Sequence, residues 1–366
     1  MTDLKKLPML PALHGRGTSN NPASRFVPLE FEPDLDLLDD PAEEQPAPQT
    51  LFLRDTTRTV INWNDSPDVG FDFSLNPYRG CEHGCIYCYA RPTHEYFGLS
   101  AGLDFETRIF VKEDAPELLQ RELSSPNWQP KPIAFSGVTD PYQPVERRLL
   151  LTRRCLRVLA DFGNPVSVIS KNHLISRDAD ILGEMAGESA AMAALSVTTL
   201  DPALQRLMEP RTSTPARRLA AIEKLATAGV PVAVMIAPVI PGLTDHEIPA
   251  ILKAAADAGA TAAGFIPVRL PFGVAPLFER WLRTHFPDRT EKVLGRIRGI
   301  RGGRLNDPRF GARMRGEGKY VEQLGALFRA ARERFGLNGE HHELSTRAWR
   351  GPGRQPPPDP SQLDLF

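Results

Sequence analysis

The stretch TRRCLRVLADFGNPVSVIS, residues 152–170, joins a helical pattern to a short β-branched run. Cys155, Leu156 and Leu159 form an apolar stripe at helical spacing, and Gly163 stands where helices often end. VSVIS (166–170) is typical of a buried strand. One helix-to-strand unit of an α/β protein is therefore predicted here.

The same unit recurs on both sides of this stretch. Buried-strand patterns occupy residues 71–77, 132–138, 166–170, 193–199, 231–239 and 263–270, and helical patterns occupy 115–123, 152–163, 216–229 and 247–259. Alternation of this kind implies parallel strands joined by right-handed crossovers. Six units favour a partial (β/α)6 barrel, with its site at the carboxyl ends of the strands.

The rest of the chain divides around that core. We predict an irregular, Pro- and acid-rich N-terminal arm over 1–66 and the (β/α)6 core over 67–290. A basic loop plus a C-terminal helix (320–336) then fills 291–350, and a flexible proline-rich tail covers 351–366.

The net charge of -1 argues against a general polyanion binder, but it hides an asymmetry. Residues 29–44 carry eight carboxylates and no cation, whereas residues 295–319 carry eight Arg or Lys against two acids. The basic stretch, 296–319, is either a phosphate-binding surface or a solvated loop paired with the acidic arm. No apolar run is long enough to span a bilayer, and the first residues lack a signal-peptide core, so we expect a soluble cytoplasmic protein.

Three of the four cysteines cluster in GCEHGCIYCYARP, residues 80–92. This spacing does not suggest a disulfide framework; it suggests ligands for a soft metal, either zinc or an iron–sulfur cluster. A zinc-binding module of three Cys and one His, with His83 or His94 as the fourth ligand, is one alternative, although structural zinc usually pairs two distant hooks. A 4Fe–4S electron carrier needs four protein ligands. Since Cys155 is predicted to be a buried core residue, three thiolates would leave one iron open.

The CxxxCxxC spacing of Cys81, Cys85 and Cys88, with Tyr87 before the third cysteine, resembles the signature of the radical S-adenosylmethionine (radical SAM) superfamily. The resemblance implies that these three residues are the catalytic metal ligands of a 4Fe–4S cluster. In that superfamily the open iron chelates the amino and carboxylate groups of SAM. An electron from the cluster then cleaves SAM to methionine and a 5'-deoxyadenosyl radical.

The resemblance and the predicted strand ends together suggest further SAM contacts. Tyr87 is placed to lie against the adenine, although the chain lacks the superfamily's common Gly-Gly-Glu after the second strand. The other predicted cofactor-binding residues are Ser136 and Asp140 for the methionine amino group, Ser170 and Lys171 for its carboxylate, Ser196 and Thr198 for the ribose, and Glu209 and Arg211 beyond them.

A longer resemblance covers residues 14–350, carried by stretches such as HGRGTSNNPASRF (14–26), SGVTDPYQPVE (136–146) and GGRLNDPRFGARMRGEG (302–318). These look like a bacterial radical SAM group classed with DNA repair photolyases and related to spore photoproduct lyase. The implied function is a repair-lyase-like reaction on DNA, with a flavodoxin- or ferredoxin-type reductant. Spore photoproduct lyase uses a cysteine near its substrate, and the only spare thiol here is Cys155. A radical SAM enzyme acting on RNA, protein or a small molecule therefore stays open.

The chain ends in QLDLF, which matches the short peptide that docks bacterial repair proteins on the DNA sliding clamp. Gln362 would hydrogen-bond at the rim of the clamp pocket, and Leu363, Leu365 and Phe366 would supply apolar contacts, with PPPDPS as a linker. The alternative is a tail that folds back on the protein's own surface.

Overall fold

A computed structural model describes residues 13, 15–26, 49–339 and 343–352. The acidic stretch 29–44 and the QLDLF ending lie outside the described residues. The predictions made for those two segments therefore stay predictions.

All six predicted buried strands are present in one seven-stranded sheet. They are β3 (Phe73–Leu75), β6 (Ile133–Phe135), β7 (Val166–Ser170), β8 (Ala191–Ser196), β9 (Val232–Val239) and β10 (Ala262–Pro267). Each pairs in parallel with the next, in chain order from β3 to β10. The predicted α/β class is confirmed, with the carboxyl ends of all six strands at one edge of the sheet.

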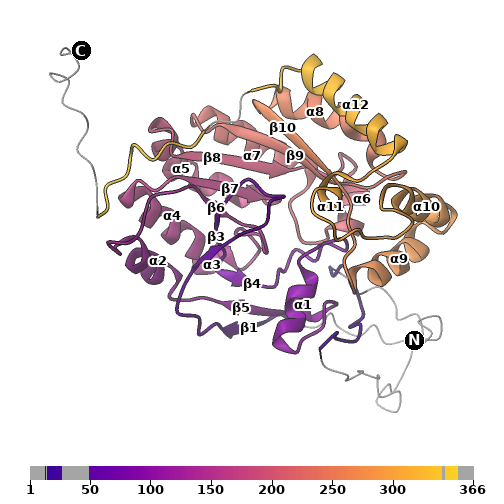
Figure 1. Cartoon of the computed structure of the whole chain (residues 1–366), viewed down its shortest axis with the longest axis horizontal. Helices are drawn as coiled ribbons and strands as arrows, with labels where there is room; N and C mark the ends of the chain where they lie inside the picture. The colour runs from indigo at the N-terminus through magenta and orange to yellow at the C-terminus, as the bar shows by residue number, and fades with distance from the viewer. Residues whose placement is uncertain (1–12, 14, 27–48, 340–342, 353–366) are drawn as a thin grey trace.

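A row of helices covers one face of this sheet (Figure 1). The row consists of α2 (Ala115–Leu123), α4 (Leu151–Phe162), α5 (Ala179–Gly187), α7 (Pro215–Thr227), α8 (Ile248–Asp257) and α12 (Lys319–Arg334), and each helix contacts the next. Their apolar stripes and the buried strand residues form the main core. Each of the five predicted helical stretches corresponds to one of these helices within a few residues.

The N-terminal arm is less irregular than predicted. Strand β2 (Ile61–Trp63) pairs antiparallel with β3 at the sheet edge, and β1 (Leu51–Arg54) joins β5 (Arg108–Val111) and β4 (Tyr78–Arg79) in a second, three-stranded sheet. The prediction of irregular structure up to residue 66 is therefore wrong for β1 and β2. These strands are only two to four residues long, too short to give a clear period-two pattern.

The predicted basic loop is partly helical. Helix α9 (Val274–His285) was not predicted, and α10 (Thr290–Ile300) spans the assumed boundary at residue 291, followed by the short α11 (Ala312–Arg315). Helices α9 and α10 bury Phe278, Trp281 and Leu294 in a second core that includes Ile86 and Met208. Helix α10 is therefore amphipathic: its apolar face packs inward, and its arginines lie at the positions between the apolar residues.

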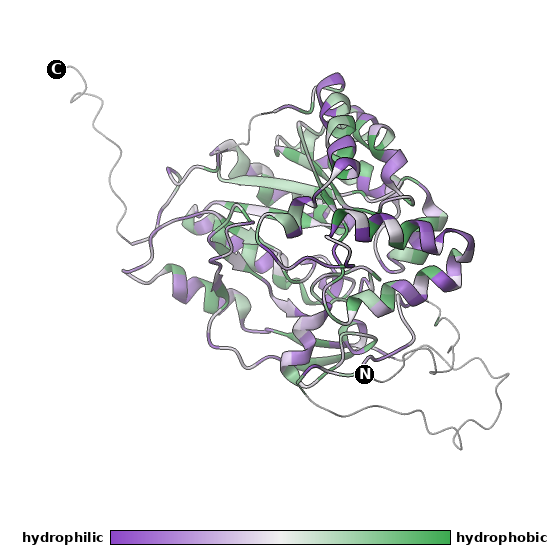
Figure 2. Ribbon diagram, turned by 45° about the vertical axis from the view of Figure 1, so that its right-hand side comes forward, coloured by the Kyte–Doolittle hydropathy of each residue, from purple (hydrophilic) through white to green (hydrophobic). Residues whose placement is uncertain are grey.

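Colouring by hydropathy places apolar residues along the strands and polar residues on the outward faces of the helices (Figure 2). Among the described residues, no helix combines the length and the apolar character that a bilayer crossing requires.

Candidate functional site

The loop that carries the three clustered cysteines, residues 80–91, follows β3 and β4 and starts at the carboxyl edge of the main sheet. Backbone bonds hold both sides of it: the Cys81 amide donates to the Phe105 carbonyl (2.9 Å), and the Ile86 amide donates to the Met208 carbonyl (3.0 Å). We call residues 80–91 the thiol loop. It is fixed to segments distant in sequence, so its cysteines have defined positions.

Arg91 closes the thiol loop from within. Its buried guanidinium donates to the carbonyls of Cys85 (3.0 Å) and Gly84 (3.2 Å), and it pairs with the buried Glu106 at 2.6 Å. Glu106 also accepts from the Gly17 amide at 2.9 Å. A buried ion pair with further hydrogen bonds imposes one geometry, because a single orientation satisfies all donors.

The N-terminal segment packs directly on this loop. A Cβ on Gly17 would overlap the carbonyl oxygen of Gly84, so only glycine permits the approach. Gly84 itself has φ +67, a left-handed conformation that favours glycine. Gly17 thus packs against the thiol loop and forms part of the wall of the site.

The three thiols are free and close enough to influence one another's ionisation. Burial raises the pKa of Cys85 and of Cys88, and the other thiols of the loop raise both further. The positive charge of Lys171 opposes this effect at both residues. Without a bound metal, Cys85 and Cys88 are therefore favoured as neutral thiols.

Of the two histidines proposed as zinc ligands, His83 lies beside Cys81 as well as Asp140, whereas His94 contacts other residues. His83 is buried, with Nδ1 3.4 Å from Asp140 Oδ2 and Nε2 3.2 Å from the Asn172 amide nitrogen. His94 bonds the Arg108 carbonyl at 2.9 Å and lies among Phe97, Phe105 and Phe110. Over the described ranges, no three His, Cys, Asp or Glu side chains are grouped to hold a single metal ion.

A fully buried carboxylate, Glu209, organises the first of two polar groups beside the thiols. Tyr87 and Arg218 donate to it at short range, and Thr198 Oγ1 donates to Glu209 Oε1 at 2.7 Å. Burial alone would raise the pKa of Glu209, but the charges of Arg218 and Lys171 and these hydrogen bonds lower it to about 2. Three predicted residues, Tyr87, Thr198 and Glu209, therefore meet in one place.

Asp140 organises the second polar group. Its carboxylate accepts from Ser170 Oγ (2.8 Å), the Lys171 amide (2.7 Å) and the Tyr142 amide (2.9 Å). With His83 beside it as well, Asp140 has both oxygens engaged. The residue joins the loops after β6 and β7, and its role as a partner of the methionine amino group stays a prediction.

Lys171 lies between these two groups. Its Nζ donates to the Ala237 carbonyl at 2.9 Å and stands 5.9 Å from the centre of the Tyr87 ring. The charge of Lys171 acts on Cys85, Cys88 and Glu209. A cation beside the thiols is what the predicted contact with a bound carboxylate requires.

The side chains of Arg211 and Ser136 bond residues outside these two groups, whereas the Ser196 carbonyl joins the first group through Arg218. Arg211 points to the other side of the thiol loop, where it pairs with Glu82 (3.1 Å) and Thr50 (3.4 Å) and lines a cavity of about 510 Å³. Ser136 Oγ bonds the Thr139 carbonyl, and Ser196 contributes its carbonyl to Arg218. The role of Arg211 as a cofactor contact therefore stays a prediction.

Sequence reasoning missed Arg218, the counter-ion of Glu209. Its position carried a signal: Ala221, Ile222 and Leu225 lie on the buried stripe of α7, and Arg218 continues that stripe one turn earlier. An arginine at a core-facing helical position needs a buried anion.

Cys155 is fully buried in the main core, on α4 with Leu156 and Leu159, as predicted. Burial raises the pKa of this thiol. It packs in the helix-to-sheet layer and contributes no group to the thiol loop.

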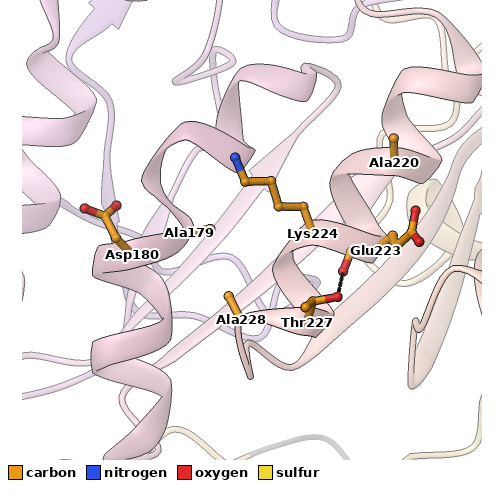
Figure 3. A pocket seen from close by; sticks show the side chains of 7 residues that line it. All are labelled: Ala179, Asp180, Ala220, Glu223, Lys224, Thr227 and Ala228. Carbon is orange, nitrogen blue, oxygen red and sulfur yellow. Dashed lines mark hydrogen bonds between the residues drawn. The ribbon is translucent and has the colours of Figure 1, made fainter.

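A further hollow lies on the helical layer between α5 and α7 (Figure 3). Its lining includes Asp180, Lys224 and Ala228, while Thr227 bonds the Glu223 carbonyl at 2.8 Å. Asp180 is already paired with Arg153 at 2.7 Å. The hollow holds none of the cysteines and gives no catalytic arrangement.

The decisive comparison concerns the parallel core: residues 75–255 match the family model of the radical SAM superfamily. Residues 75–255 form a radical SAM domain. Enzymes of this superfamily use a 4Fe–4S cluster and S-adenosylmethionine, and those are the cofactors of the domain. The matched range begins in β3 and contains all three cysteines of the thiol loop.

Proteins similar to this chain occur in bacteria and archaea. An uncharacterized protein of Mycobacterium tuberculosis is 38% identical over 220 residues, 60% of this chain and 65% of its own length. An uncharacterized protein of Methanocaldococcus jannaschii is 28% identical over 184 residues, 50% of this chain and 66% of its own. The chain thus spans less than two thirds of the length of these curated relatives.

Solved structures of spore photoproduct lyase share the fold. A mutant with bound AdoMet and dinucleoside spore photoproduct superimposes with a TM-score of 0.55 at 17% identity, over 78% of each chain. A complex with dinucleoside spore photoproduct gives 0.53 at 16% identity, over 78% of this chain and 79% of the other. The likeness extends beyond the radical SAM domain to the surrounding chain.

Proposed function

We propose that this protein is a radical SAM enzyme that cleaves S-adenosylmethionine reductively and acts on DNA. One observation carries the proposal: three free thiols, spaced CxxxCxxC, share one clamped loop at the carboxyl edge of a parallel sheet. Cys81, Cys85 and Cys88 would hold the cluster. When bound, the 4Fe–4S cluster supplies the electron that splits SAM into methionine and a 5'-deoxyadenosyl radical.

The chain's own residues would bind and orient S-adenosylmethionine. Lys171 is the cation available for the methionine carboxylate, and Tyr87, Ser170 and Thr198 supply polar groups beside the thiols. Glu209 and Arg218 keep Tyr87 and Thr198 in place, because their own charges are mutually satisfied. The other predicted contacts, Ser136, Ser196 and Arg211, have the weakest support.

Support for DNA as the substrate comes from the fold likeness to spore photoproduct lyase and from the basic segment 296–319. That segment is only partly free for phosphates. Arg301 is buried against backbone carbonyls, Arg309 pairs with Asp307, and Arg313 pairs with Asp68. Arg298, Arg304, Arg315 and Lys319 have no paired acid among the described residues and remain for a ligand. Because Cys155 is a core residue, we do not extend the proposal to the spore lesion itself.

The test is anaerobic purification followed by iron and sulfide analysis and measurement of 5'-deoxyadenosine formed from SAM with dithionite. We expect about four irons per chain and reductive cleavage. Cys85→Ala should lose the cluster and all cleavage, because no other thiol is placed to replace it. Cys155→Ala is the matched control and should retain both.

A wild-type chain that carries zinc and no iron after anaerobic handling would overturn the proposal and restore the zinc-module alternative. Cleavage retained by Cys85→Ala would overturn the ligand assignment. A cluster-bearing enzyme that produces 5'-deoxyadenosine with RNA, peptide or a small molecule, and no faster with damaged DNA, would exclude DNA as the substrate.

We further propose recruitment to DNA through the sliding clamp by Gln362, Leu363, Leu365 and Phe366. Their support is the QLDLF match alone, since the tail lies outside the described residues. Micromolar binding to purified bacterial clamp that disappears on deleting residues 362–366 is the expected result. Equal binding by the truncated chain would overturn the docking role.

A further inference from the structure

Three exposed aromatic rings near the thiol loop each carry an arginine guanidinium on the ring. The pairs are Arg269 over Tyr89 at 4.3 Å, Arg25 over Phe272 at 3.8 Å and Arg313 over Phe310 at 4.5 Å. The rings remain 46%, 60% and 62% exposed in that order. Exposed rings of this size rarely gather without a binding role.

The three pairs lie around one edge of the radical SAM domain. Tyr89 directly follows Cys88, and Arg269 and Phe272 both belong to the loop that follows β10 at its carboxyl end. Burial lowers the pKa of Arg269, and the nearby charge of Arg313 lowers it further. Arg269 therefore links the three pairs: it lies over Tyr89, shares a loop with Phe272 and interacts with the charge of Arg313.

Two more exposed rings extend this surface at the Phe272 end. Phe26 is 54% exposed and Tyr96 is 72% exposed, and their ring centres are 5.1 Å apart. The Arg25 guanidinium also lies 4.9 Å from the centre of the Phe26 ring. We call Phe26, Tyr89, Tyr96, Phe272 and Phe310, with Arg25, Arg269 and Arg313, the aromatic–arginine surface.

Buried or well-bonded groups anchor the surface. Arg25 pairs with Glu95, which is 2% exposed, at 2.6 Å. Arg313 pairs with Asp68 and donates to Ser66 at 2.5 Å. The hydroxyl of Tyr89 donates to the Gly137 carbonyl. Since the arginines are held on the protein side, the exposed parts of the rings are presented to a ligand in fixed positions.

We propose that the aromatic–arginine surface stacks unpaired bases of single-stranded or locally opened DNA beside the thiol loop. Bases stack on aromatic rings whatever their identity, and guanidinium groups add cation–π and phosphate contacts. A strand bound there would present its bases at the carboxyl edge of the sheet, where the reaction site lies. The inference rests on the proposed function for the choice of DNA.

The experiment is fluorescence anisotropy of a labelled 12-nucleotide oligothymidylate with the full chain, without SAM or reductant. We expect tighter binding than to a duplex of the same length. Phe272→Ala and Phe310→Ala should each weaken single-strand binding about 5- to 150-fold, the range for one stacked base. Phe272→Trp should retain binding, because it keeps an aromatic face.

Phe52→Ala is the matched control. Phe52 is 38% exposed on β1 and has the Arg148 guanidinium 5.4 Å away, but it lies outside the aromatic–arginine surface. Its substitution should leave binding within twofold of wild type. Unchanged binding in both Phe272→Ala and Phe310→Ala, or equal affinity for the duplex, would overturn the inference.

The readout separates this inference from the proposed function. Because binding is measured without turnover, loss of SAM cleavage would not alter it. If Phe272→Ala and Phe310→Ala both form 5'-deoxyadenosine normally and bind DNA like the wild type, the base-stacking role of the surface is overturned. The proposed function would then still stand.

Discussion

Arginines occur in two contrasting settings in this protein. We call the buried ion pairs of Arg91 and Arg218 the floor of the site, and the basic segment 296–319 its rim. At the floor, Arg91 and Arg218 are buried and pair with the buried Glu106 and Glu209. At the rim, arginines of segment 296–319 such as Arg304 and Arg315 are exposed. Buried charges must be matched, because desolvation penalises an unpaired ion heavily, whereas exposed charges are hydrated. The floor therefore sets geometry, and the rim has charge to offer a ligand.

The largest effect should follow from breaking a floor pair. Arg218→Met keeps the length of the side chain but leaves Glu209 without its counter-ion. We expect a loss of about 3–5 kcal/mol in the free energy of unfolding, the range for removing one partner of a buried pair. Urea titration followed by tryptophan fluorescence measures it.

Arg298→Met on α10 is the control at the rim. Its side chain has no ion pair among the described residues, so the unfolding free energy should change by less than about 0.5 kcal/mol. Similar losses in both variants would contradict the contrast between floor and rim.

The contacts at the floor could not be predicted from the sequence as well as the strands, helices and cysteines could. Six strands, five helices and three cysteines were predictable, because periodicity and spacing are local. The contacts of Glu209 were not predicted: Tyr87 and Thr198 were expected only as SAM contacts, and Arg218 lies on a helix whose buried face had to be known. The three-stranded sheet was not predictable either, since its strands are short and their order, β1-β5-β4, depends on distant pairing.

A second prediction concerns the pH dependence of stability that arises from the buried His94. Burial lowers the pKa of His94 to about 4, although its bond to the Arg108 carbonyl favours the protonated ring. With Nε2 donating to that carbonyl, Nδ1 has no partner among the described residues. Protonation at Nδ1 would therefore add an unsatisfied buried charge.

Because the pKa of His94 is lower in the folded chain than in the unfolded chain, acid should destabilise the fold. The unfolded chain takes up a proton near pH 6.5 and the folded chain only near 4, so stability is full above 6.5 and falls as pH drops toward 4. Between pH 7 and pH 5 the loss from His94 is about 2 kcal/mol. In His94→Phe, whose ring suits the surrounding phenylalanines, that part of the pH dependence should vanish. Identical pH profiles of unfolding in the variant and wild type would show that His94 titrates normally.

The smallest effect on stability, and a specific effect on binding, is expected at the rim. Changing Arg304, Arg315 and Lys319 together to Gln should leave the unfolding free energy almost unchanged, because all three are exposed. Removing one phosphate-binding cation lowers the slope of log affinity against log salt by about 0.7 for single strands, so the slope should fall by about 2.

A matched control removes the same charge elsewhere: Arg121, Arg206 and Arg217, also exposed, are changed to Gln. Anisotropy titrations with oligothymidylate across a range of salt concentrations should show the reduced slope only in the rim variant. Equal slopes in the two variants would mean that the rim adds only net charge, and the stacked rings would then have to supply the affinity. If the salt slope falls in the rim variant and the Phe272→Ala and Phe310→Ala variants still weaken binding, two separate contacts are indicated. The rim arginines would then hold phosphates, and the aromatic–arginine surface would hold bases.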